Sequence, residues 1–350
     1  MSAELRLPNK RRHNGAVSET AQPNLVERSP ERSPLLTTSV DAAAEALLGG
    51  AVVAFPTETV YGLGACTTIE SALGRVFQIK GRPRSHPLIV HLGSVTQLDQ
   101  WVSHFPAWAA TLAEQLWPGP LTLVLPRSAH VSDSVTGGQD TVGLRVPDHP
   151  VALALLTAVG TGVAAPSANR FGSVSATSAA HVVSELGRYL DAAHDLVLDG
   201  GTCPVGVEST IVLATGEQPR LLRPGAISEL DITTITGLRV LPADGSVRAP
   251  GTLAAHYSPH ASVVIAQADS VDRWKGDSTS GLIAEAGVPT PQGVHRLAQP
   301  TGLTEYAYAL YAALRSADDL GLRTVVAVAP EGSDGLAVAI RDRLQRAAAE

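Results

Sequence analysis

Lysine is unusually scarce in this chain of 350 residues. Its 26 basic residues are 23 arginines and three lysines, and Lys80 is the only lysine between Lys10 and Lys275. Cysteine is scarcer still, because Cys66 and Cys203 are the only two and lie far apart without a C-x-x-C spacing. Two such cysteines indicate core residues in a reducing cytosol rather than a disulfide framework.

Long apolar runs and an excess of positive charge are also missing. No run approaches the roughly 18 apolar residues that span a bilayer, and the N-terminus lacks the apolar stretch of a signal peptide. We therefore expect a cytoplasmic chain with no membrane partner. The net charge of −7 means that the chain as a whole does not attract nucleic acid electrostatically. Any contact with RNA would therefore need a local patch of positive charge.

The motifs of several large enzyme classes are absent. The chain has no G-x-x-x-x-G-K-[ST] phosphate loop, no convincing dinucleotide fingerprint, no H-E-x-x-H zinc motif and no G-x-S-x-G nucleophile elbow. These absences argue against the nucleotide-binding, zinc-dependent and acyl-transfer enzyme classes that these motifs mark.

What the chain does contain is a cluster of cations where a helical pattern meets a turn. Lys80 ends the helical pattern, Gly81 and Pro83 form the turn, and Arg82 and Arg84 add positive charge. A lysine ammonium is a point-charge ligand for phosphate, while a guanidinium is a planar fork. The cluster indicates a phosphate chain, although a solvated helix C-terminus, where cations favour the helix dipole, explains it about equally well.

Changes in composition divide the chain into four parts. Residues 1–35 are polar and charged, which predicts a disordered tail whose Lys10-Arg11-Arg12 cluster is solvated rather than bound to RNA. Residues 36–238 alternate strand and helix patterns and are predicted to form one α/β domain, to which the resemblance described below assigns the catalytic function. Residues 239–260 are rich in Gly, Pro and Ala and predict a linker, and residues 261–350 predict a small C-terminal α/β domain.

The catalytic segment is predicted to be an α/β domain with a twisted mixed sheet, because its late strands follow one another closely. The predicted helices run between Ser39 and Gly49, from Thr68 or Ser71 to Lys80, over 105–116 and 149–159, and after Thr177. The predicted strands are 51–55, 88–92, 121–125, 142–146, 163–165, 196–198, 209–213 and 220–222.

The C-terminal segment shows fewer elements and no clustered polar residues on its loops. Its predicted strands are 262–266 and 324–329, and its predicted helices are 304–320 and 336–349. Leu310, Leu314 and Leu320 are apolar residues of a helix face and predict core. We interpret this domain either as an anchor for a segment that covers a binding site or as a platform for interactions with other proteins.

Five loops of the catalytic segment are rich in hydroxyl groups, amides and cations. Two of them directly follow strands, where α/β proteins bind ligands. Turn and cap functions explain the Ser, Thr and Asn residues of any one loop, and a lone His91 on an apolar strand is more often a satisfied core residue. Together the groups suit phosphate binding more than covalent catalysis. The loops are 56–64, 80–87, 165–175, 206–210 and 222–225.

Taken in order, these segments resemble the YrdC-like threonylcarbamoyl-AMP synthases in their long, two-domain form. The matching motifs are PTETVYGL at 56–63, KGRP at 80–83, HPLIVH at 86–91, WPGPLT at 117–122, APSAN at 165–169, LRPG at 222–225, PG at 250–251 and HYSP at 256–259. The resemblance covers about residues 36–350. The family often has Asn in place of His86 and Ala in place of Ser258, and the first difference leaves the function of His86 open.

The resemblance implies a fold and an activity. The fold is a twisted α/β sheet with a large, concave, positively charged cavity, followed by a Rossmann-like C-terminal domain. The activity is the synthesis of threonylcarbamoyl-adenylate from L-threonine, bicarbonate or CO2, and ATP, with release of pyrophosphate. Partner proteins then transfer the threonylcarbamoyl group to the adenosine next to the anticodon of certain tRNAs.

Residue roles follow from the matched motifs alone. Lys80 and Arg82 are expected to be the catalytic cations, and no protein metal site is expected. The residues expected to bind ATP are Lys80, Arg82, His86, Ser167, Asn169, Ser175, Arg223 and Tyr257. The residues expected to bind threonine are Thr59, His91, Thr122, Arg145 and Ser209.

The implied chemistry needs no covalent intermediate with the enzyme. We expect Mg²⁺ to bind through the ATP phosphates rather than in a protein cage. Glu58 and Glu208 are the nearest carboxylates, and a structural hydrogen-bonding role is about as consistent with their positions as a metal or substrate role. The labile carbamate favours a cover over the cavity, and the linker around His256 and Tyr257 is the candidate.

Three other functions remain as alternatives. A non-enzymatic RNA-binding protein would use the same cavity, and a weak RNA contact is kept as a partner, but the acidic net charge argues against RNA binding as the main function. A carbamoyl transferase of the larger YrdC-containing type would carry zinc-finger and acylphosphatase-like segments, which this chain lacks. A regulator site in the C-terminal domain is the third.

Overall fold

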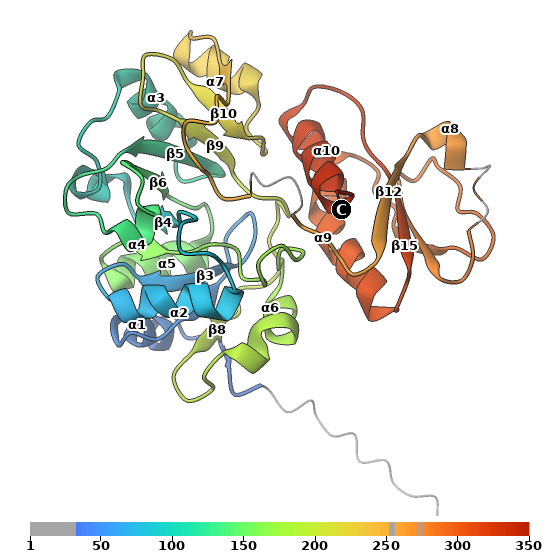
Figure 1. Cartoon of the computed structure of the whole chain (residues 1–350), viewed down its shortest axis with the longest axis horizontal. Helices are drawn as coiled ribbons and strands as arrows, with labels where there is room; N and C mark the ends of the chain where they lie inside the picture. Colours follow the sequence, from blue (N-terminus) through green and yellow to red (C-terminus); the bar gives the residue numbers. More distant parts are fainter. Residues whose placement is uncertain (1–32, 252–255, 272–273, 275, 350) are drawn as a thin grey trace, which may run out of the picture. The chain divides into compact units, whose positions relative to one another are not determined.

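The computed structural model describes residues 33–251, 256–271, 274 and 276–349, and two sheets organise them (Figure 1). The first sheet has 11 strands and the second has four. Residues 1–32 of the predicted tail, including its basic cluster, lie outside the described residues. The linker residues 252–255 also lie outside them. No helix in the described part of the chain is long and apolar enough to cross a membrane.

The first sheet is built from short strands. These are β1 (Leu36–Thr37), β2 (Val53–Phe55), β3 (Gly62–Cys66), β4 (Ile89–His91), β5 (Leu121–Pro126), β6 (Thr141–Arg145), β7 (Val163–Ala164), β8 (Leu196–Leu198), β9 (Thr210–Leu213), β10 (Arg220–Arg223) and β11 (Leu241–Pro242). Their order is β1-β8-β2-β3-β7-β4-β6-β5-β9-β10-β11. Strand β6 pairs parallel with β4 and antiparallel with β5, which confirms the predicted mixed sheet.

Helices precede or follow most of these strands. They are α1 (Val40–Leu48), α2 (Glu70–Lys80), α3 (Ala107–Leu116), α4 (Asp133–Thr136), α5 (Pro150–Val159), α6 (Ala179–Leu186) and α7 (Glu229–Thr236), with 3₁₀ turns η1 (Val95–Gln100) and η2 (Gly187–Tyr189). Helix α1 begins where Ser39 Oγ accepts a hydrogen bond from Ala42 N–H. Helix α2 ends at Gly81, whose left-handed φ of +65° glycine adopts without a Cβ penalty.

Several elements of the first domain were not predicted from the sequence, namely β1, β3, α4, α7 and β11. The predicted ligand loop 56–64 ends in strand β3, where Gly62 and Gly64 hide the strand pattern. A Cβ on Gly64 would lie 2.8 Å from the side chains of both Phe55 and Val163, so close packing requires glycine there. Helix α7 was not predicted, because Ile232 is the only residue that it buries and its apolar pattern is weak.

The second sheet is wholly parallel and forms a small Rossmann-like α/β domain. Its elements are β12 (Ser262–Ala266), α8 (Ala268–Val271), β13 (Ser280–Ile283), β14 (His295–Ala298), α9 (Leu303–Asp319), β15 (Thr324–Val328) and α10 (Gly335–Ala347). The strand order is β12-β15-β13-β14. The sequence prediction missed β13 and β14, because each has four residues and carries no clear alternation.

Most of the predicted core residues are buried. Cys66 and Cys203 are buried and free, as the sequence predicted. Leu310 and Leu314 are buried in the second domain. Leu320 was wrongly predicted as core, because it follows the last turn of α9 as the C-cap residue and is 56% exposed.

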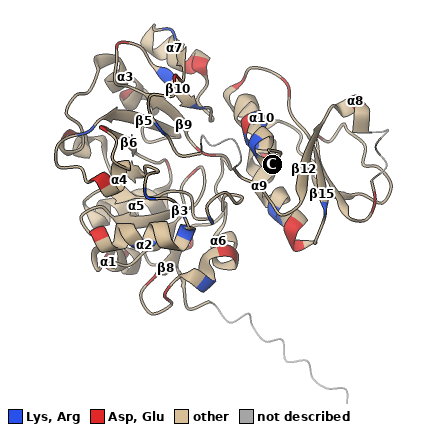
Figure 2. Cartoon of the chain, in the orientation of Figure 1, with Lys and Arg blue, Asp and Glu red and all other residues tan. Residues whose placement is uncertain are grey.

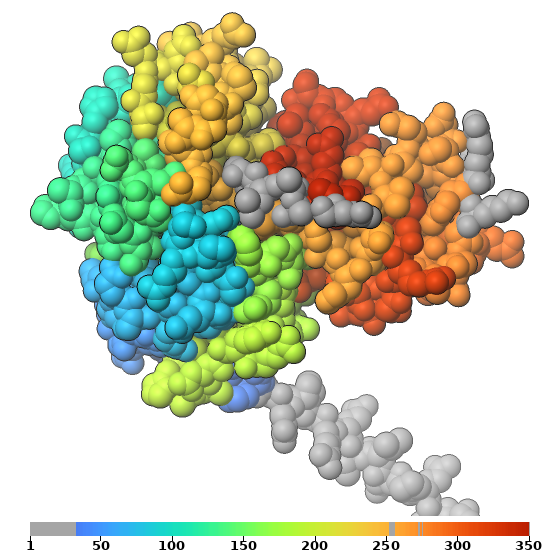
Figure 3. Space-filling model, in the orientation of Figure 1, coloured from blue at the N-terminus to red at the C-terminus, as the bar shows by residue number. Residues whose placement is uncertain are grey.

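The two domains also contact each other directly. Arg315 of α9 donates through Nε to Ser175 O over 3.2 Å and forms an ion pair with Glu185 of α6. The space-filling view shows yellow-green and orange atoms meeting along this boundary (Figure 3). The loop 165–175, which carries Ser167, Asn169 and Ser175, therefore lies against the second domain.

Candidate active site

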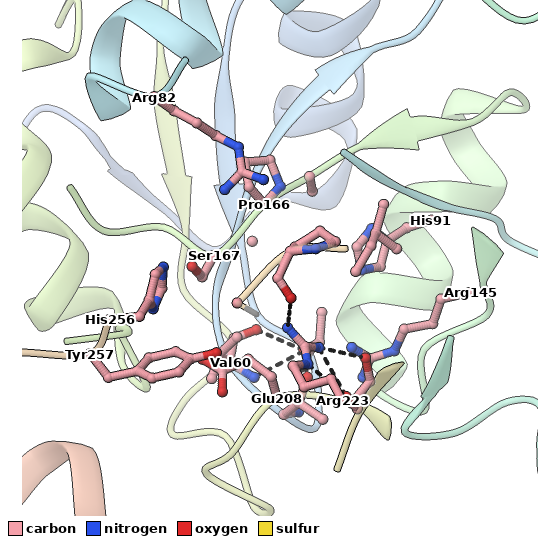
Figure 4. Close-up of a pocket in the computed structure, with 18 residues that line it drawn as sticks. Val60, Arg82, His91, Arg145, Pro166, Ser167, Glu208, Arg223, His256 and Tyr257 are labelled. Carbon is pink, nitrogen blue, oxygen red and sulfur yellow. Dashed lines mark hydrogen bonds between the residues drawn. The ribbon is translucent and has the colours of Figure 1, made fainter. Parts of the chain in front are cut away.

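One cavity collects residues from all five of the loops singled out in the sequence. Figure 4 shows Arg82, Arg145, Arg223 and Tyr257 entering it from different sides. Its lining residues are Thr57, Thr59, Val60, Gly62, Arg82, Ile89, His91, Arg145, Ala165, Pro166, Ser167, Glu208, Ser209, Arg223, Pro250, Gly251, His256 and Tyr257. Ile89 begins β4 and His91 ends it, so the cavity runs along this central strand.

Eight of the thirteen predicted site residues line this cavity and five do not. The lining eight are Thr59, Arg82, His91, Arg145, Ser167, Ser209, Arg223 and Tyr257. The other five are Lys80, His86, Thr122, Asn169 and Ser175. Four of these five are buried next to the lining residues, while His86 is half-buried and contacts Phe171 through a T-shaped ring pair at 5.3 Å.

The two predicted catalytic cations lie in different environments. Lys80 Nζ donates to Ser167 O over 2.6 Å and to Asn169 O over 2.5 Å, so the ammonium holds the 167–169 loop. Burial and the charge of Arg82 hold the Lys80 pKa well below its usual range. Arg82 Nη2 donates to Pro87 O over 2.9 Å, and burial lowers the Arg82 pKa to about 10. Arg82 is therefore the cation of this turn that faces the cavity.

The residues predicted to bind threonine form two hydroxyl pairs and one ion pair. Thr122 Oγ1 lies 2.8 Å from Ser209 Oγ, and Thr59 Oγ1 lies 2.8 Å from Thr57 Oγ1. The guanidinium of Arg145 forms a 2.7 Å ion pair with Glu58, and each of these side chains is 5% exposed.

Arg145 and Glu58 form an ion pair, but the directions of their atoms do not make a hydrogen bond. Arg145 Nη2 and both Glu58 carboxylate oxygens lack a hydrogen-bond partner among the described residues. The Arg145 guanidinium donates through Nε to Gly119 O over 3.3 Å, which holds it at the end of β6. The remaining N–H groups of Arg145 are thus available to a carboxylate in the cavity.

Arg223 organises the loops around it. Its Nε and Nη2 both donate to Ser209 O, over 3.1 and 2.9 Å, and its Nη1 donates to Pro250 O over 3.0 Å. Nη2 also donates to Ser209 Oγ over 3.1 Å. Arg223 thus connects the start of β9 to the linker. Pro250, Gly251, His256 and Tyr257 bring that linker into the cavity wall.

Glu208 has a structural role in this arrangement. Its carboxylate accepts hydrogen bonds from Ser175, Tyr311 and Arg343. Burial would raise the Glu208 pKa, but the charges of Arg343 and Arg223 and the Ser175 hydrogen bond outweigh it and bring the pKa to about 2. The sequence interpretation missed Tyr311 and Arg343. The available signal was a cation at position 343, on the same apolar face of α10 as Ile340, Leu344 and Ala347.

Unpaired buried polar atoms concentrate around the cavity. Twelve buried side-chain nitrogen and oxygen atoms in the described ranges lack a hydrogen-bond partner. Four of them belong to lining residues and have no ionic partner either: Arg82 Nε, His91 Nδ1, His256 Nδ1 and Tyr257 Oη. A fifth lining atom, Arg145 Nη2, forms the 2.7 Å ion pair with Glu58. Buried polar groups normally have partners, so this concentration indicates a polar ligand.

His91 supplies a prediction for acid stability. Burial and the charge of Arg145 lower the His91 pKa from 6.5 to about 3, so the folded protein holds the imidazole neutral. Between those two pH values the unfolded chain binds more protons, so the free energy of unfolding decreases as pH falls through this range. His91 should contribute a loss of about 2 kcal/mol between pH 8 and pH 5.

Urea unfolding of wild type and of a His91→Gln variant at pH 8 and pH 5 measures this contribution. The variant should lose about 2 kcal/mol less than wild type between the two pH values. Equal losses in the two proteins would mean that His91 titrates normally in the fold. A matched His104→Gln variant controls for the removal of any histidine, because His104 is exposed.

Comparison with known proteins identifies the class to which the fold and cavity belong. A family model described as telomere recombination matches residues 45–225, and one described as the C-terminal domain of threonylcarbamoyl-AMP synthase matches residues 226–349. A threonylcarbamoyl-AMP synthase of Pyrococcus abyssi is 38% identical over 314 residues, which cover 85% of this chain and 90% of the relative. One of Bacillus subtilis is 37% identical over 322 residues, covering 87% and 92%.

A solved structure agrees with this assignment. P. abyssi Sua5 complexed with L-threonine superposes with a TM-score of 0.79 at 37% identity, covering 88% of this chain and 94% of that one. The fold is therefore that of a YrdC-like α/β protein with a second, Rossmann-like domain. The chain belongs to the two-domain threonylcarbamoyl-AMP synthase family, which is a family of enzymes. The family models meet at residues 225 and 226, while the first sheet continues to β11.

Proposed function

We propose that this chain is a nucleotidyltransferase that makes L-threonylcarbamoyladenylate from L-threonine, bicarbonate or CO2, and ATP. One observation carries the proposal: buried, unpaired nitrogen and oxygen atoms converge on a single cavity lined by three arginines. Three guanidinium groups suit a triphosphate and a carboxylate together. The naming of the relatives and the threonine complex of a similar structure support the same activity.

The lining residues suit both substrates. Arg145, His91 and the hydroxyl of Thr59 offer donors and a neutral imidazole, which suit the carboxylate, ammonium and hydroxyl of threonine. Arg82 and Arg223 also line the cavity, as does Ser167, and their guanidinium groups suit a triphosphate. The residues behind the lining, such as Lys80, hold the loops that carry these groups.

The proposed reaction proceeds in two steps without a covalent enzyme intermediate. The neutral amine of threonine adds to CO2 and loses a proton, which forms a carbamate. A carbamate oxygen then attacks the α-phosphorus of ATP, and the bond from the α-phosphorus to the α,β-bridging oxygen breaks as pyrophosphate leaves. Arg82 offsets the charge that grows on the leaving group, Lys80 holds the 167–169 loop from behind the cavity wall, and the cavity holds the reactants in line.

Mg²⁺ is proposed to enter as part of the substrate, bound to the ATP phosphates. Among the described residues, no group of three or more His, Cys, Asp and Glu side chains could hold a metal ion. Glu208 is occupied by three donors, and Glu58 is paired with Arg145. This chain therefore fits a metal that relies on phosphate oxygens and water, which is the usual preference of Mg²⁺.

The product is proposed to be used in tRNA modification. Partner proteins would transfer the threonylcarbamoyl group to the adenosine next to the anticodon, and the labile product favours transfer in the cytoplasm close to its synthesis. The linker residues His256 and Tyr257 line the cavity, which supports the proposed cover. RNA binding as the main function is not favoured, because basic and acidic residues are interspersed over the described elements (Figure 2).

Threonine-dependent release of pyrophosphate tests the proposal. The full chain is incubated with MgATP, bicarbonate and either L-threonine, L-serine or no amino acid, and pyrophosphate is measured by a coupled enzyme assay. We expect release that requires bicarbonate and L-threonine, with the adenylate detected by mass spectrometry. Release that does not depend on threonine, or no release together with no binding of ATP or threonine by calorimetry, would reject the proposed activity.

A further inference from the structure

The second domain reaches the residues around the cavity through two fully buried side chains, Tyr311 of α9 and Arg343 of α10. Each of them is 0% exposed. Tyr311 Oη and Arg343 Nε both donate to Glu208 Oε2 over 2.8 Å. Ser175 Oγ donates to Glu208 Oε1 over 2.6 Å, so donors from both domains fix the Glu208 carboxylate.

Arg343 also holds a second loop of the first domain. Its Nη2 donates to Pro224 O over 3.0 Å. Pro224 follows Arg223, and Glu208 precedes Ser209, so one guanidinium binds next to two lining residues. Arg223 and Ser209 are hydrogen bonded to each other as well. Movement of Arg343 would therefore shift both of these residues.

Tyr257 of the linker is held by the same two side chains. The Arg343 guanidinium carbon lies 5.2 Å from the Tyr257 ring centroid, and the Tyr311 ring stacks on it at 5.7 Å and 24°. Tyr257 has a left-handed φ of 63°, which is a strained conformation for a residue with a Cβ. The ring contacts offset this strain and keep Tyr257 in the cavity wall.

The loop that carries Glu208 has no space to adjust by itself. Gly206 has a φ of +82°, and a Cβ on it would lie 2.4 Å from Ala307 O and 2.6 Å from Tyr308 Cα. The backbone at residue 206 therefore packs directly against helix α9. This close approach, together with the Arg343 contacts, fixes the loop relative to the second domain.

We propose that Arg343 is a positioning residue for the reaction, and that the second domain completes the substrate site through it. Arg343 does not line the cavity, and it acts through Glu208, Pro224 and Tyr257. The inference rests on the proposed function. Stability alone is a weak reason for such an arrangement, because replacing a buried ion pair with apolar residues is often neutral or stabilising.

Three substitutions separate positioning from folding. Arg343→Met removes the guanidinium but keeps a long apolar stem. Tyr311→Phe removes one hydrogen bond to Glu208 and keeps the ring stacked on Tyr257. Arg341→Met is the matched control, because Arg341 lies on the same helix and binds Pro330 O and Gly332 O within the second domain.

The first readout is steady-state kinetics below the unfolding temperature of every variant. We expect Arg343→Met to lower kcat/KM at least tenfold, with KM for ATP or threonine increased. Tyr311→Phe should lower it about threefold, and Arg341→Met should stay within twofold of wild type. Arg343→Lys should recover only part of the loss, since one ammonium cannot bond Glu208 and Pro224 with the geometry of a planar fork.

The second readout is hydrogen–deuterium exchange, which needs no turnover. We expect Arg343→Met to increase exchange in residues 206–211 and 223–226 while β15 stays protected. Wild-type kcat and KM in folded Arg343→Met would overturn the inference, and so would an increase in exchange spread evenly over the second domain. An inactive wild type would reject the proposed function instead, while a local change in exchange would still support the Arg343 contacts.

Discussion

Replacing Lys80 with methionine is expected to lower threonine-dependent pyrophosphate release by about 10²–10³-fold, the range typical of removing one preorganised electrostatic donor. Lys80 is 2% exposed, and its ammonium holds the carbonyls of Ser167 and Asn169. The variant removes a charge close to Arg82 and releases the loop that carries Ser167. The release assay with purified variant and wild type, at saturating and limiting ATP, measures the effect.

Two further variants show whether the Lys80 effect is specific. Arg84→Ala removes an exposed cation from the same turn and should change the rate less than twofold. Lys80→Arg keeps the charge but should remain at least tenfold slower than wild type, because a planar fork does not fit the place of an ammonium between two carbonyls. A rate near wild type in folded Lys80→Met would contradict the assigned role. Circular dichroism and thermal unfolding establish that the variant is folded.

Replacing Arg145 with methionine is expected to affect both stability and threonine use. The substitution leaves Glu58 as a buried carboxylate without its ion-pair partner, which costs about 3–5 kcal/mol of unfolding free energy. It also removes the guanidinium proposed to bind the threonine carboxylate. Loss of a charge-assisted hydrogen bond should raise KM for threonine about 10–100-fold. Urea unfolding and kinetics with varied threonine measure the two effects.

A double variant separates these two effects of Arg145. Adding Glu58→Gln to Arg145→Met removes the uncompensated charge, so most of the lost stability should return. The increased KM for threonine should remain, because the guanidinium is still absent. Recovery of both properties would mean that Arg145 contributes only to stability. A KM for ATP that rises as much as the KM for threonine would argue against a threonine-specific role.

The order of motifs in the sequence was enough to predict the family, the mixed sheet and thirteen site residues. The motifs lie on loops whose neighbouring strands are short and apolar, so strand patterns such as 88–92 and 142–146 located them correctly. The comparisons confirm the family and the fold. The individual residue roles stay predictions. The structure gives positions only: eight of the thirteen residues line the cavity, and five lie behind the lining or next to it.

The expectation that ligand loops lie at the carboxyl ends of strands applies only in part. That rule describes parallel sheets. Here β7 pairs antiparallel with β4, so the loop after β7 lies near the start of β4 while His91 lies at its end. Both still line one cavity because β4 has only three residues, and the cavity runs along its full length.

The sequence by itself determined which chemical groups are available and roughly where the chain turns. A linear pattern can carry such features as the apolar runs, the helix-ending glycines and the order of the loops along the chain. Only the tertiary structure decided that Lys80 bonds carbonyls behind the cavity while Arg82 faces it, and that Arg343, 135 residues from Glu208, fixes that carboxylate. Such pairings depend on how distant segments pack, because a side chain's partners are set by the fold and not by its neighbours in sequence.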